Sequence, residues 1–344
     1  MDAVDEVVLL LRGAWVSLSL RAACELGVMD ALDEPLGLTE LADRTSSDPA
    51  ALARLLRVLV DLDLLSVDEA GYRATTRGEV LRSDHPTGVR NLALMQTALP
   101  NLAAWQHLAD GVRRGRAVFE NLHQMTYWEW LAAHPEVGAL FNASMARRSA
   151  LQVSAIEAAH DLSTAGLVVD VGGGKGAMLS RLLDAHLSLR GIVADRPEVA
   201  AAATEALAAA GQGSRARGEP ADFFAEVPSG GDVYVLSNVL HDWADADAVS
   251  ILRTVHRAMS PGAFLLIVEN VLDAPDRTPP DQRDQHLVDL HMLVMFGARE
   301  RTQQEYDALL VEAGFTPSVI APSPNQWNVL RSQTRHSGPS ATDS

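Results

Sequence analysis

The sequence contains one cysteine, Cys24, and one lysine, Lys175, among its 344 residues. A lone cysteine cannot form an internal disulfide, and the apolar surroundings of Cys24 favour a small core residue over a reactive thiol. Basic residues are scarce as a class, because 28 Lys and Arg stand against 45 Asp and Glu, for a net charge of −17. A chain of this charge repels nucleic acid and anionic membranes, so we expect neither as a partner.

Long apolar runs are also missing. No uninterrupted apolar run reaches the roughly 18 residues of a membrane span. The acidic residues Asp2, Asp5 and Glu6 stand where a signal peptide would carry positive charge. These absences predict a cytoplasmic protein with no membrane association. What the sequence does contain is 47% hydrophobic residues, enough for two domains that each bury a core.

The first part of the chain has the pattern of a small helical domain. Apolar residues recur at helical spacing over residues 7–32, and residues 38–65 predict two helices, the second with Asp48 as its N-cap and Pro49 in its first turn. Residues 67–74 predict a hairpin. Helices followed by a hairpin describe a winged helix, which often binds DNA, but acidic residues outnumber arginines here. A docking or dimerisation module is therefore favoured over a DNA-binding regulator.

The rest of the chain changes from helical to alternating patterns. Residues 91–165 read as helices rich in aromatic residues. Beyond Gly166, apolar runs alternate with helical ones, which predicts a parallel sheet covered by helices on both faces. The predicted strands are 167–171, 190–194, 232–238 and 263–269. We expect a surface loop at 273–285 and a frayed tail from 331. The predicted divisions are 1–90, a winged-helix-like dimerisation domain; 91–165, a helical linker and pocket region; 166–332, a Rossmann-like α/β domain; and 333–344, a disordered tail.

A glycine-rich turn follows the first predicted strand and precedes a helical pattern. Such a turn lets the backbone approach a ligand, and the free N–H groups of the next helix face it, so a nucleotide-like cofactor is expected. A Walker loop is excluded, because Lys175 is followed by glycine instead of Ser or Thr. A dinucleotide fingerprint remains open, since Gly172, Gly174 and Ala177 fit its spacing and Asp195 lies where a ribose-binding acid belongs.

Further motifs separate the cofactors that use this crevice. An acid followed by an aromatic residue, Asp222-Phe223, can bind an adenine, with the acid accepting from its amino group and the ring covering its face. The sequence also contains, in order, Val169-Asp170-Val171-Gly172-Gly173-Gly174, Asp222-Phe223, His241-Asp242-Trp243, Val268-Glu269 and Arg299-Glu300-Arg301-Thr302. With these motifs the sequence resembles the S-adenosylmethionine-dependent O-methyltransferases of the plant caffeate and microbial natural-product type. The resemblance spans most of the chain.

The resemblance implies S-adenosylmethionine as cofactor, S-adenosylhomocysteine as product and no metal. It assigns a cofactor-binding role to six residues of this sequence. These are Gly172 at the methionine part, Asp195 at the ribose, Asp222 and Phe223 at the adenine, Ser149 on the cofactor side, and Ser237 where plant members carry a lysine.

The chemistry of methyl transfer requires alignment of the acceptor oxygen and removal of one proton. His241 lies beyond an apolar strand at the edge of the sheet where ligands bind, and an imidazole with an ordinary pKa of about 6.5 can accept a phenol proton. Glu269 ends the next strand and can hold the imidazole tautomer. The resemblance gives Glu269 and Glu300 this flanking role. Asp242 is a further acid beside the base, or the cap of the following helix.

A metal site formed by His286, Asp289 and His291 is disfavoured, because residues five apart lie about 140° around a helix and do not face one ligand. The acceptor pocket is expected to be apolar and polarisable, suited to a small aromatic or polyketide-like hydroxy compound. Its expected lining is Trp105, Trp128, Phe141, Met145, Asp242, Met292 and Met295. The resemblance also implies a homodimer through the N-terminal helices.

Two other enzyme functions stay open at this point. A nicotinamide-dependent oxidoreductase rests only on the glycine loop and Asp195. A family member that binds the cofactor yet catalyses hydroxylation or decarboxylation is disfavoured by the intact His241 and Glu269.

Overall fold

The computed structural model describes residues 2–274 and 278–335, without the side chains of 142, 143, 145–147, 279 and 280. The chain divides into two compact units. The first comprises Met1–Leu108 and Phe119–Arg147, and the second comprises Ala109–Val118 and Arg148–Ser344. One long helix, α11 (Pro135–Ala159), runs through the boundary at Arg147. The segment 336–344 of the expected tail lies outside the described residues.

The first unit is helical apart from one hairpin. Its elements are α1 (Ala3–Leu11), α2 (Gly13–Glu25), α3 (Leu38–Arg44), α4 (Pro49–Asp61), β1 (Leu65–Asp68), β2 (Gly71–Ala74), α5 (Thr76–Glu79), α6 (Val89–Gln96), α7 (Leu99–Gln106), α9 (Val118–His123), α10 (Tyr127–Ala133) and the start of α11. Asp48 caps α4 by accepting from the N–H of Ala51, as its sequence predicts. The hairpin is confirmed, and its turn needs Gly71, whose φ is +118° and whose Cβ would strike the carbonyl of Leu36.

The first two helices leave large apolar side chains in solvent in the single chain. Among the most exposed are Leu10 at 70%, Leu11 at 73% and Trp15 at 67%. The stretch Ala3–Glu25, which holds both helices, is long and apolar enough to cross a membrane by length and composition alone. The stretch is interrupted by charged residues such as Arg12, so it is not an uninterrupted apolar run. An exposed apolar surface of this kind needs a partner or an apolar environment.

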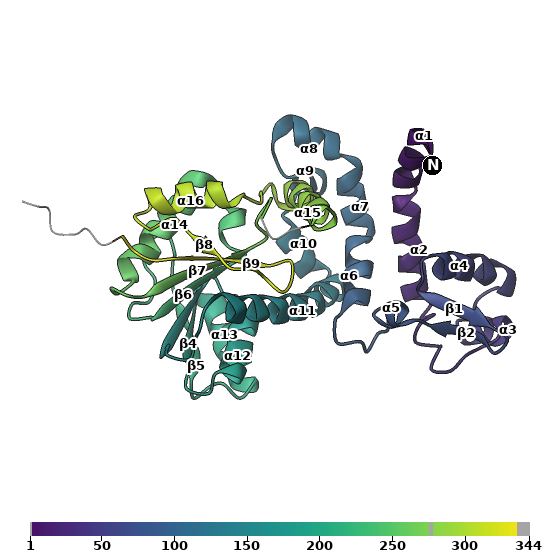
Figure 1. Ribbon diagram of the computed structural model, residues 1–344, viewed down its shortest axis with the longest axis horizontal. Helices are drawn as coiled ribbons and strands as arrows, with labels where there is room; N and C mark the ends of the chain where they lie inside the picture. Colours follow the sequence, from purple (N-terminus) through teal and green to yellow (C-terminus); the bar gives the residue numbers. More distant parts are fainter. Residues whose placement is uncertain (1, 275–277, 336–344) are drawn as a thin grey trace, which may run out of the picture. The chain divides into compact units, whose positions relative to one another are not determined.

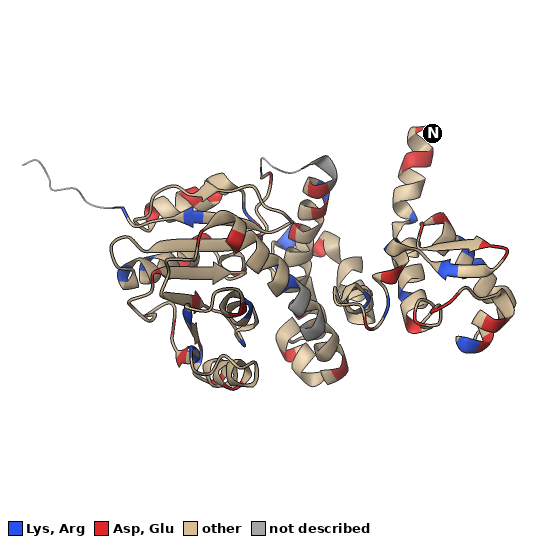
Figure 2. Ribbon diagram, turned by 60° about the horizontal axis from the view of Figure 1, so that its bottom comes forward, with Lys and Arg blue, Asp and Glu red and all other residues tan. Residues whose placement is uncertain are grey.

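The first unit carries charged residues of both signs (Figure 2). Several of its arginines are paired, as Arg44 is with Glu34 and Glu40, and Arg82 is with Asp33. Paired arginines offer little to a phosphate backbone. The expectation that nucleic acid is not a partner stays a prediction.

The second unit is a seven-stranded sheet in the order β5-β4-β3-β6-β7-β9-β8, with helices around it (Figure 1). Its elements are α8 (Leu108–Arg114), the rest of α11, β3 (Leu167–Val171), α12 (Ala177–Ala185), β4 (Arg190–Asp195), α13 (Pro197–Ala209), β5 (Ala216–Pro220), β6 (Val233–Ser237), η1 (Leu240–Asp242), α14 (Asp245–Ala258), β7 (Phe264–Glu269), α15 (Pro279–Phe296), α16 (Gln303–Glu312), β8 (Val319–Ile320) and β9 (Asn328–Ser332). The Rossmann-like sheet expected from the sequence is confirmed.

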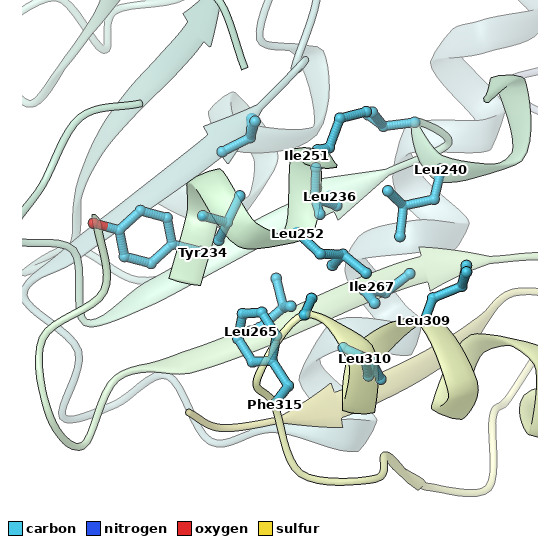
Figure 3. Packing of buried hydrophobic residues seen from close by; sticks show 14 of the residues in the cluster. Tyr234, Leu236, Leu240, Ile251, Leu252, Leu265, Ile267, Leu309, Leu310 and Phe315 are labelled. Carbon is cyan, nitrogen blue, oxygen red and sulfur yellow. The ribbon is translucent and has the colours of Figure 1, made fainter. Parts of the chain in front are cut away.

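The sheet buries both faces, as its apolar strands require. Alternate strand residues point to opposite sides, so that Val169 and Leu236 pack with α14 and α16, whereas Val168 and Val235 pack with α12 and α13. Figure 3 shows the first of these cores, where side chains of β6 and β7 meet those of α14 and α16. Because both sides are covered, ligands must approach at the ends of the strands.

Three expectations about the second unit need correction. The sheet is not purely parallel, since β9 pairs antiparallel with β7 and β8. The stretch 273–285 is not all loop, because Thr278 and Asp281 form a capping box that starts α15 at Pro279. The chain does not fray from 331: β9 extends to Ser332, and the N–H of Arg335 donates to the carbonyl of Gly314.

Candidate active site

The glycine-rich turn follows the carboxyl end of β3. Gly172, Gly174 and Gly176 have φ of +73°, +58° and +76°, values that favour glycine strongly. A Cβ on Gly172 would lie 2.8 Å from a methyl of Val239, so only glycine lets the backbone turn this closely. The predicted strand, turn and helix are confirmed, and they leave open space at Gly174.

Two carboxylates lie behind this turn. Asp195 ends β4, and its Oδ2 accepts from the N–H of Gly174 at 3.0 Å, which ties the acid to the loop. Asp170 is buried, and neither of its carboxylate oxygens has a hydrogen-bond partner among the described residues. Burial, followed by the charge of Asp195, raises the pKa of Asp170 to about 7. An unpartnered buried carboxylate beside a glycine loop suits a cationic ligand such as S-adenosylmethionine.

An aromatic wall stands beside the same loop. The Phe223 ring packs against Phe224 at 5.2 Å and Trp243 at 5.9 Å between centroids. One of its edge carbons would lie 3.8 Å from a Cβ on Gly172. Asp222 is exposed, and its Oδ1 accepts from the N–H of Phe224 at 3.0 Å. The ring thus lies where it can cover the face of a base bound over the loop.

The other two expected cofactor residues lie on separate elements of the second unit. Ser237 ends β6 and is half-buried, and the side-chain amide of Asn238 donates to its Oγ at 3.4 Å. Ser149 lies on α11 and is buried. Both roles stay predictions.

His241 lies in the η1 turn after β6, between acidic side chains. Its Nδ1 is 3.2 Å from Oε2 of Glu269 and 3.4 Å from Oε1 of Glu300. Its Nε2 is 3.6 Å from Oδ1 of Asp242. Asp242 does not cap α14, whose N-cap is Ala244. The geometry therefore assigns Nδ1 to the two buried glutamates and leaves Nε2 as the ring nitrogen that can meet an acceptor.

The glutamates are held in different ways. Glu269 is fully buried, and its Oε1 accepts from the N–H groups of Val239 at 3.2 Å and Leu240 at 3.1 Å. Its other oxygen is thereby aimed at the imidazole. The main-chain N–H of Glu300 donates to Oδ1 of Asp289 at 2.8 Å, which fixes the backbone but not the carboxylate.

Burial and the charges in this cluster shift the pKa values of both His241 and Glu269. Burial alone would lower the pKa of His241, but Glu269, followed by Glu300 and Asp242, raises it to about 9. Burial raises the pKa of Glu269 to about 7, against the lowering effect of the imidazolium. An imidazole whose conjugate acid has a pKa near 9 is a stronger base than free histidine and is closer in pKa to a phenol, at about 10.

The same three side chains satisfy the distance requirements of a metal site. Their ligand atoms lie within 4.8 Å of one another. The histidines that the sequence raised as ligands lie elsewhere, with His286 3.3 Å from Asp273. Burial lowers the pKa of the other, His291, to about 4. The same arrangement of His241, Glu269 and Glu300 would therefore suit either a histidine base held by two carboxylates or a metal ion with three ligands.

The expected acceptor residues fall in both units. In the first unit, Trp128 is 54% exposed and its ring meets Phe141 edge-on at 5.5 Å, and Trp105 is half-buried on α7. In the second, Met292 and Met295 are buried on α15. The side chain of Met145 lies outside the described residues.

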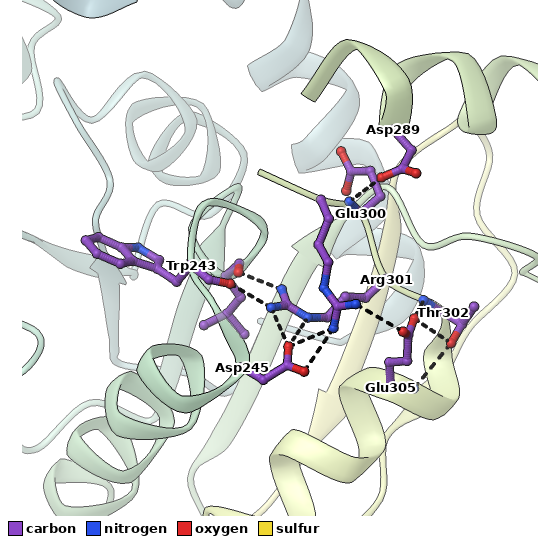
Figure 4. A network of polar contacts seen from close by, with 9 residues as sticks. Trp243, Asp245, Asp289, Glu300, Arg301, Thr302 and Glu305 are labelled. Atoms are coloured by element: carbon purple, nitrogen blue, oxygen red, sulfur yellow. Dashed lines mark hydrogen bonds and ion pairs between the residues drawn. The ribbon is translucent and has the colours of Figure 1, made fainter. Parts of the chain in front are cut away.

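Sequence reasoning missed Arg301 as a site residue. Its side chain is fully buried, and Figure 4 shows its guanidinium group in contact with Asp245. Arg301 is part of the Arg299-Glu300-Arg301-Thr302 motif, but the motif alone does not indicate which of its charged side chains is buried.

A glycine-rich turn at the switch point of a sheet covered on both faces, together with a buried histidine and two buried glutamates, fits a methyltransferase of the S-adenosylmethionine-dependent class. Comparison with known proteins agrees. Family models for an O-methyltransferase domain and an O-methyltransferase dimerisation domain match residues 105–316 and 8–84. The chain belongs to the O-methyltransferase family.

Individual relatives cover nearly the whole chain. It is 36% identical to a phenazine O-methyltransferase from Lysobacter antibioticus, over 94% of both chains. The solved structure of a mitomycin 7-O-methyltransferase matches with a TM-score of 0.83 and 34% identity, covering 97% of this chain and 98% of the other. An O-methyltransferase from neocarzinostatin biosynthesis, solved with S-adenosylmethionine and 2-hydroxy-5-methyl naphthoic acid, matches with a TM-score of 0.73 and 33% identity, covering 93% and 96%. The protein is an enzyme of secondary metabolism, and S-adenosylmethionine is its cofactor.

Proposed function

We propose that this enzyme methylates a hydroxyl, of phenolic type, on a small aromatic or polyketide-like acceptor, with His241 as the general base. The observation that carries the proposal is the placement of Nδ1 of His241 between Glu269 and Glu300, at 3.2 and 3.4 Å. An imidazole held in this way keeps one tautomer and offers Nε2 to the acceptor oxygen.

The residues of this chain have distinct tasks in the reaction. When bound, S-adenosylmethionine supplies an electrophilic methyl group. His241 takes the acceptor proton at Nε2, and Glu269 stabilises the imidazolium that results, with Glu300 as its second partner. Because these groups are buried, their electrostatic interactions are stronger than they would be in water. The cluster works without a metal in this proposal.

The cofactor is held by residues at the carboxyl edge of the sheet. In this proposal, Gly172 gives the methionine part access to the backbone, Asp195 binds the ribose, and Asp222 with Phe223 binds the adenine. Ser149 and Ser237 add polar contacts. The unpartnered carboxylate of Asp170 supports the presence of a positively charged ligand beside the glycine-rich turn.

Removal of the Asp195 carboxylate is expected to weaken cofactor binding. Asp195→Ala deletes the acceptor for the ribose hydroxyls and for the N–H of Gly174, so the Kd for S-adenosylhomocysteine should rise by about tenfold or more. Calorimetric titration measures this. Asp247→Ala, which removes an exposed acid from α14, is the matched control. An unchanged Kd for Asp195→Ala would reject the ribose role.

The acceptor is proposed to lie against apolar and aromatic side chains, with Asp242 beside its reacting hydroxyl. Trp105, Trp128, Phe141, Met145, Met292 and Met295 are the residues proposed to line it. The phenazine O-methyltransferase and the O-methyltransferase solved with a naphthoic acid support an aromatic acceptor of two or three rings. A panel of hydroxylated naphthoic and benzoic acids, assayed for methylated product, is the direct screen.

One alternative is favoured by a specific relative. The chain is 35% identical, over 92% of its length, to 8-amino-8-demethylriboflavin N,N-dimethyltransferase from Streptomyces davaonensis. Transfer to an aromatic amine is therefore the second candidate. It needs less from a base, because an amine can attack before it loses its proton. Hydroxylation or decarboxylation and nicotinamide chemistry are left as weaker alternatives.

We also propose a cytoplasmic homodimer in which the exposed apolar side chains of α1 and α2 are covered by the second subunit. Dimerisation accounts for Leu10, Leu11 and Trp15 without a membrane. Sedimentation at micromolar concentration should give the mass of two chains. Leu11→Glu together with Trp15→Glu should shift the equilibrium to the monomer, and Leu187→Glu, another exposed apolar residue far along the sequence, should not. A wild-type monomer in detergent-free buffer at these concentrations would contradict the dimer.

A further inference from the structure

Arg301 is a charged residue with no exposed side-chain surface. Burying a guanidinium is costly unless its N–H groups are satisfied. Here Nη1 donates to the carbonyl of Leu240 at 2.7 Å, and Nη2 donates to the carbonyl of Trp243 at 2.6 Å. Nε and Nη2 both donate to Oδ1 of Asp245, at 3.1 and 2.8 Å (Figure 4). The guanidinium group therefore donates these four hydrogen bonds to one short segment, residues 240–245.

That piece of chain carries His241. The two carbonyls that Arg301 binds belong to the residue before His241 and to the second residue after it. The main-chain N–H of Arg299 donates to the carbonyl of His241 itself at 3.2 Å. The turn is a single 3₁₀ turn, Leu240–Asp242, so it has few hydrogen bonds of its own. Its position therefore depends on the residues that hold it from outside.

The same segment carries Glu300. Arg301 follows Glu300 directly, and the carbonyl of Arg301 accepts from the N–H of Leu272 at 2.9 Å, which fixes the segment beside the chain that follows β7. One side chain thus connects the backbone next to Glu300 with the turn that carries His241. If the His241 turn moved away from the backbone next to Glu300, the 3.4 Å contact between Nδ1 of His241 and Oε1 of Glu300 would lengthen.

We propose that Arg301 is a positioning residue for methyl transfer: its guanidinium fork holds the His241 turn against the Glu300 segment, with Asp245 as its counter-ion. The inference rests on the role of His241 proposed above. Lysine cannot replace the fork, because a single ammonium cannot reach two carbonyls and a carboxylate with the same planar geometry. A displacement of about 1 Å at a catalytic base can lower the rate by about 10²-fold.

A purely structural role for Arg301 predicts a different result. Loss of a buried fork would then lower the free energy of unfolding, while the surviving folded enzyme would keep its normal pH dependence. Positioning predicts a change in the proton affinity of His241 itself. The groups that set this affinity are Glu269, Glu300 and Asp242, with Arg148 acting on the acids.

The test is Arg301→Lys, which keeps the charge, compared with Arg299→Lys. Arg299 pairs with the same Asp245 at 2.8 Å but is 48% exposed, so it is a matched control. For Arg301→Lys we expect kcat to fall by about 10²-fold and the Kd for S-adenosylhomocysteine to stay unchanged. Arg299→Lys should be close to wild type in both.

A titration of His241 by NMR, with its signal assigned from its loss in His241→Gln, gives a readout that does not require turnover. In Arg301→Lys the pKa of His241 should move from its raised value toward about 6.5, the value without close carboxylates. Asp245→Asn, which weakens the counter-ion and leaves Arg301 in place, should move it in the same direction by less. It serves as the second variant if Arg301→Lys does not fold.

The outcomes separate the two levels of the argument. A folded Arg301→Lys with wild-type kcat and an unshifted His241 titration overturns the positioning role. A shifted titration with unchanged kcat supports the positioning role of Arg301 but rejects His241 as the base. In that case the proposed function fails and the positioning role does not.

Discussion

Replacement of His241 by alanine should lower turnover by about 10²–10⁴-fold, the usual effect of losing a general base. The variant has no imidazole to take the proton of the acceptor, while the cofactor residues Gly172 and Asp195 are unchanged. Affinity for S-adenosylhomocysteine should therefore stay within measurement error. Single-turnover rates with a phenolic acceptor, together with calorimetric titration, measure the two effects separately.

His286→Ala is the control for this substitution. His286 is exposed and contacts Asp273, so its loss should leave both the rate and the affinity unchanged. Two results would contradict the base role. One is undiminished turnover in His241→Ala, which would leave alignment as the source of catalysis. The other is loss of wild-type activity on treatment with a chelator, which would favour a metal at His241, Glu269 and Glu300.

The second large effect is expected for Glu269→Gln. The glutamine has the shape of the glutamate, and its oxygen should stay on the N–H groups of Val239 and Leu240. Its amide NH₂ would then face Nδ1 of His241 and force the proton onto Nε2, the nitrogen that has to accept. The wrong tautomer should lower kcat by about 10²-fold or more, as in other dyads of this kind.

The pH dependence gives a further expectation for the same variant. With a pKa of about 9, His241 in the wild type gains its basic form as pH rises, so kcat/KM should rise from pH 7 to about 9. Loss of the Glu269 charge should lower this apparent pKa, so the curve should level off at lower pH. Glu300→Gln should have a smaller effect, because no main-chain N–H among the described residues donates to its carboxylate, whereas two donate to that of Glu269. Equal effects of both substitutions would contradict the assignment of separate roles.

The strands at the centre of the sheet were predictable because they are buried on both faces. β3, β4, β6 and β7 are short apolar runs, and their positions follow from the sequence within one residue or so. β5 was missed because it lies at the edge of the sheet and carries Arg217 and Glu219. β9 was missed because Arg331 and Ser332 look like the start of a polar tail, although Val329 and Leu330 are buried.

The active-site cluster was predictable to a different extent for each residue. His241 follows β6 and Glu269 ends the neighbouring parallel strand β7, so their meeting at one edge of the sheet follows from topology. Glu300 lies beyond the eighteen residues of α15, and no local pattern brings it to His241. Its role came only from the family resemblance. Arg301 could not have been foreseen as a buried group, because arginines are almost always exposed.

The measurement that tests the central claim most directly uses S-adenosylmethionine with a deuterated methyl group and an aromatic acceptor that carries a hydroxyl and an amine on one ring. Fragmentation mass spectrometry of the product locates the label. The account predicts a trideuteromethyl ether, formed faster as pH rises toward 9 and almost absent with His241→Ala. Label on nitrogen, formed at equal rates by the wild type and His241→Ala, would contradict both the O-methyl transfer and the role of the histidine.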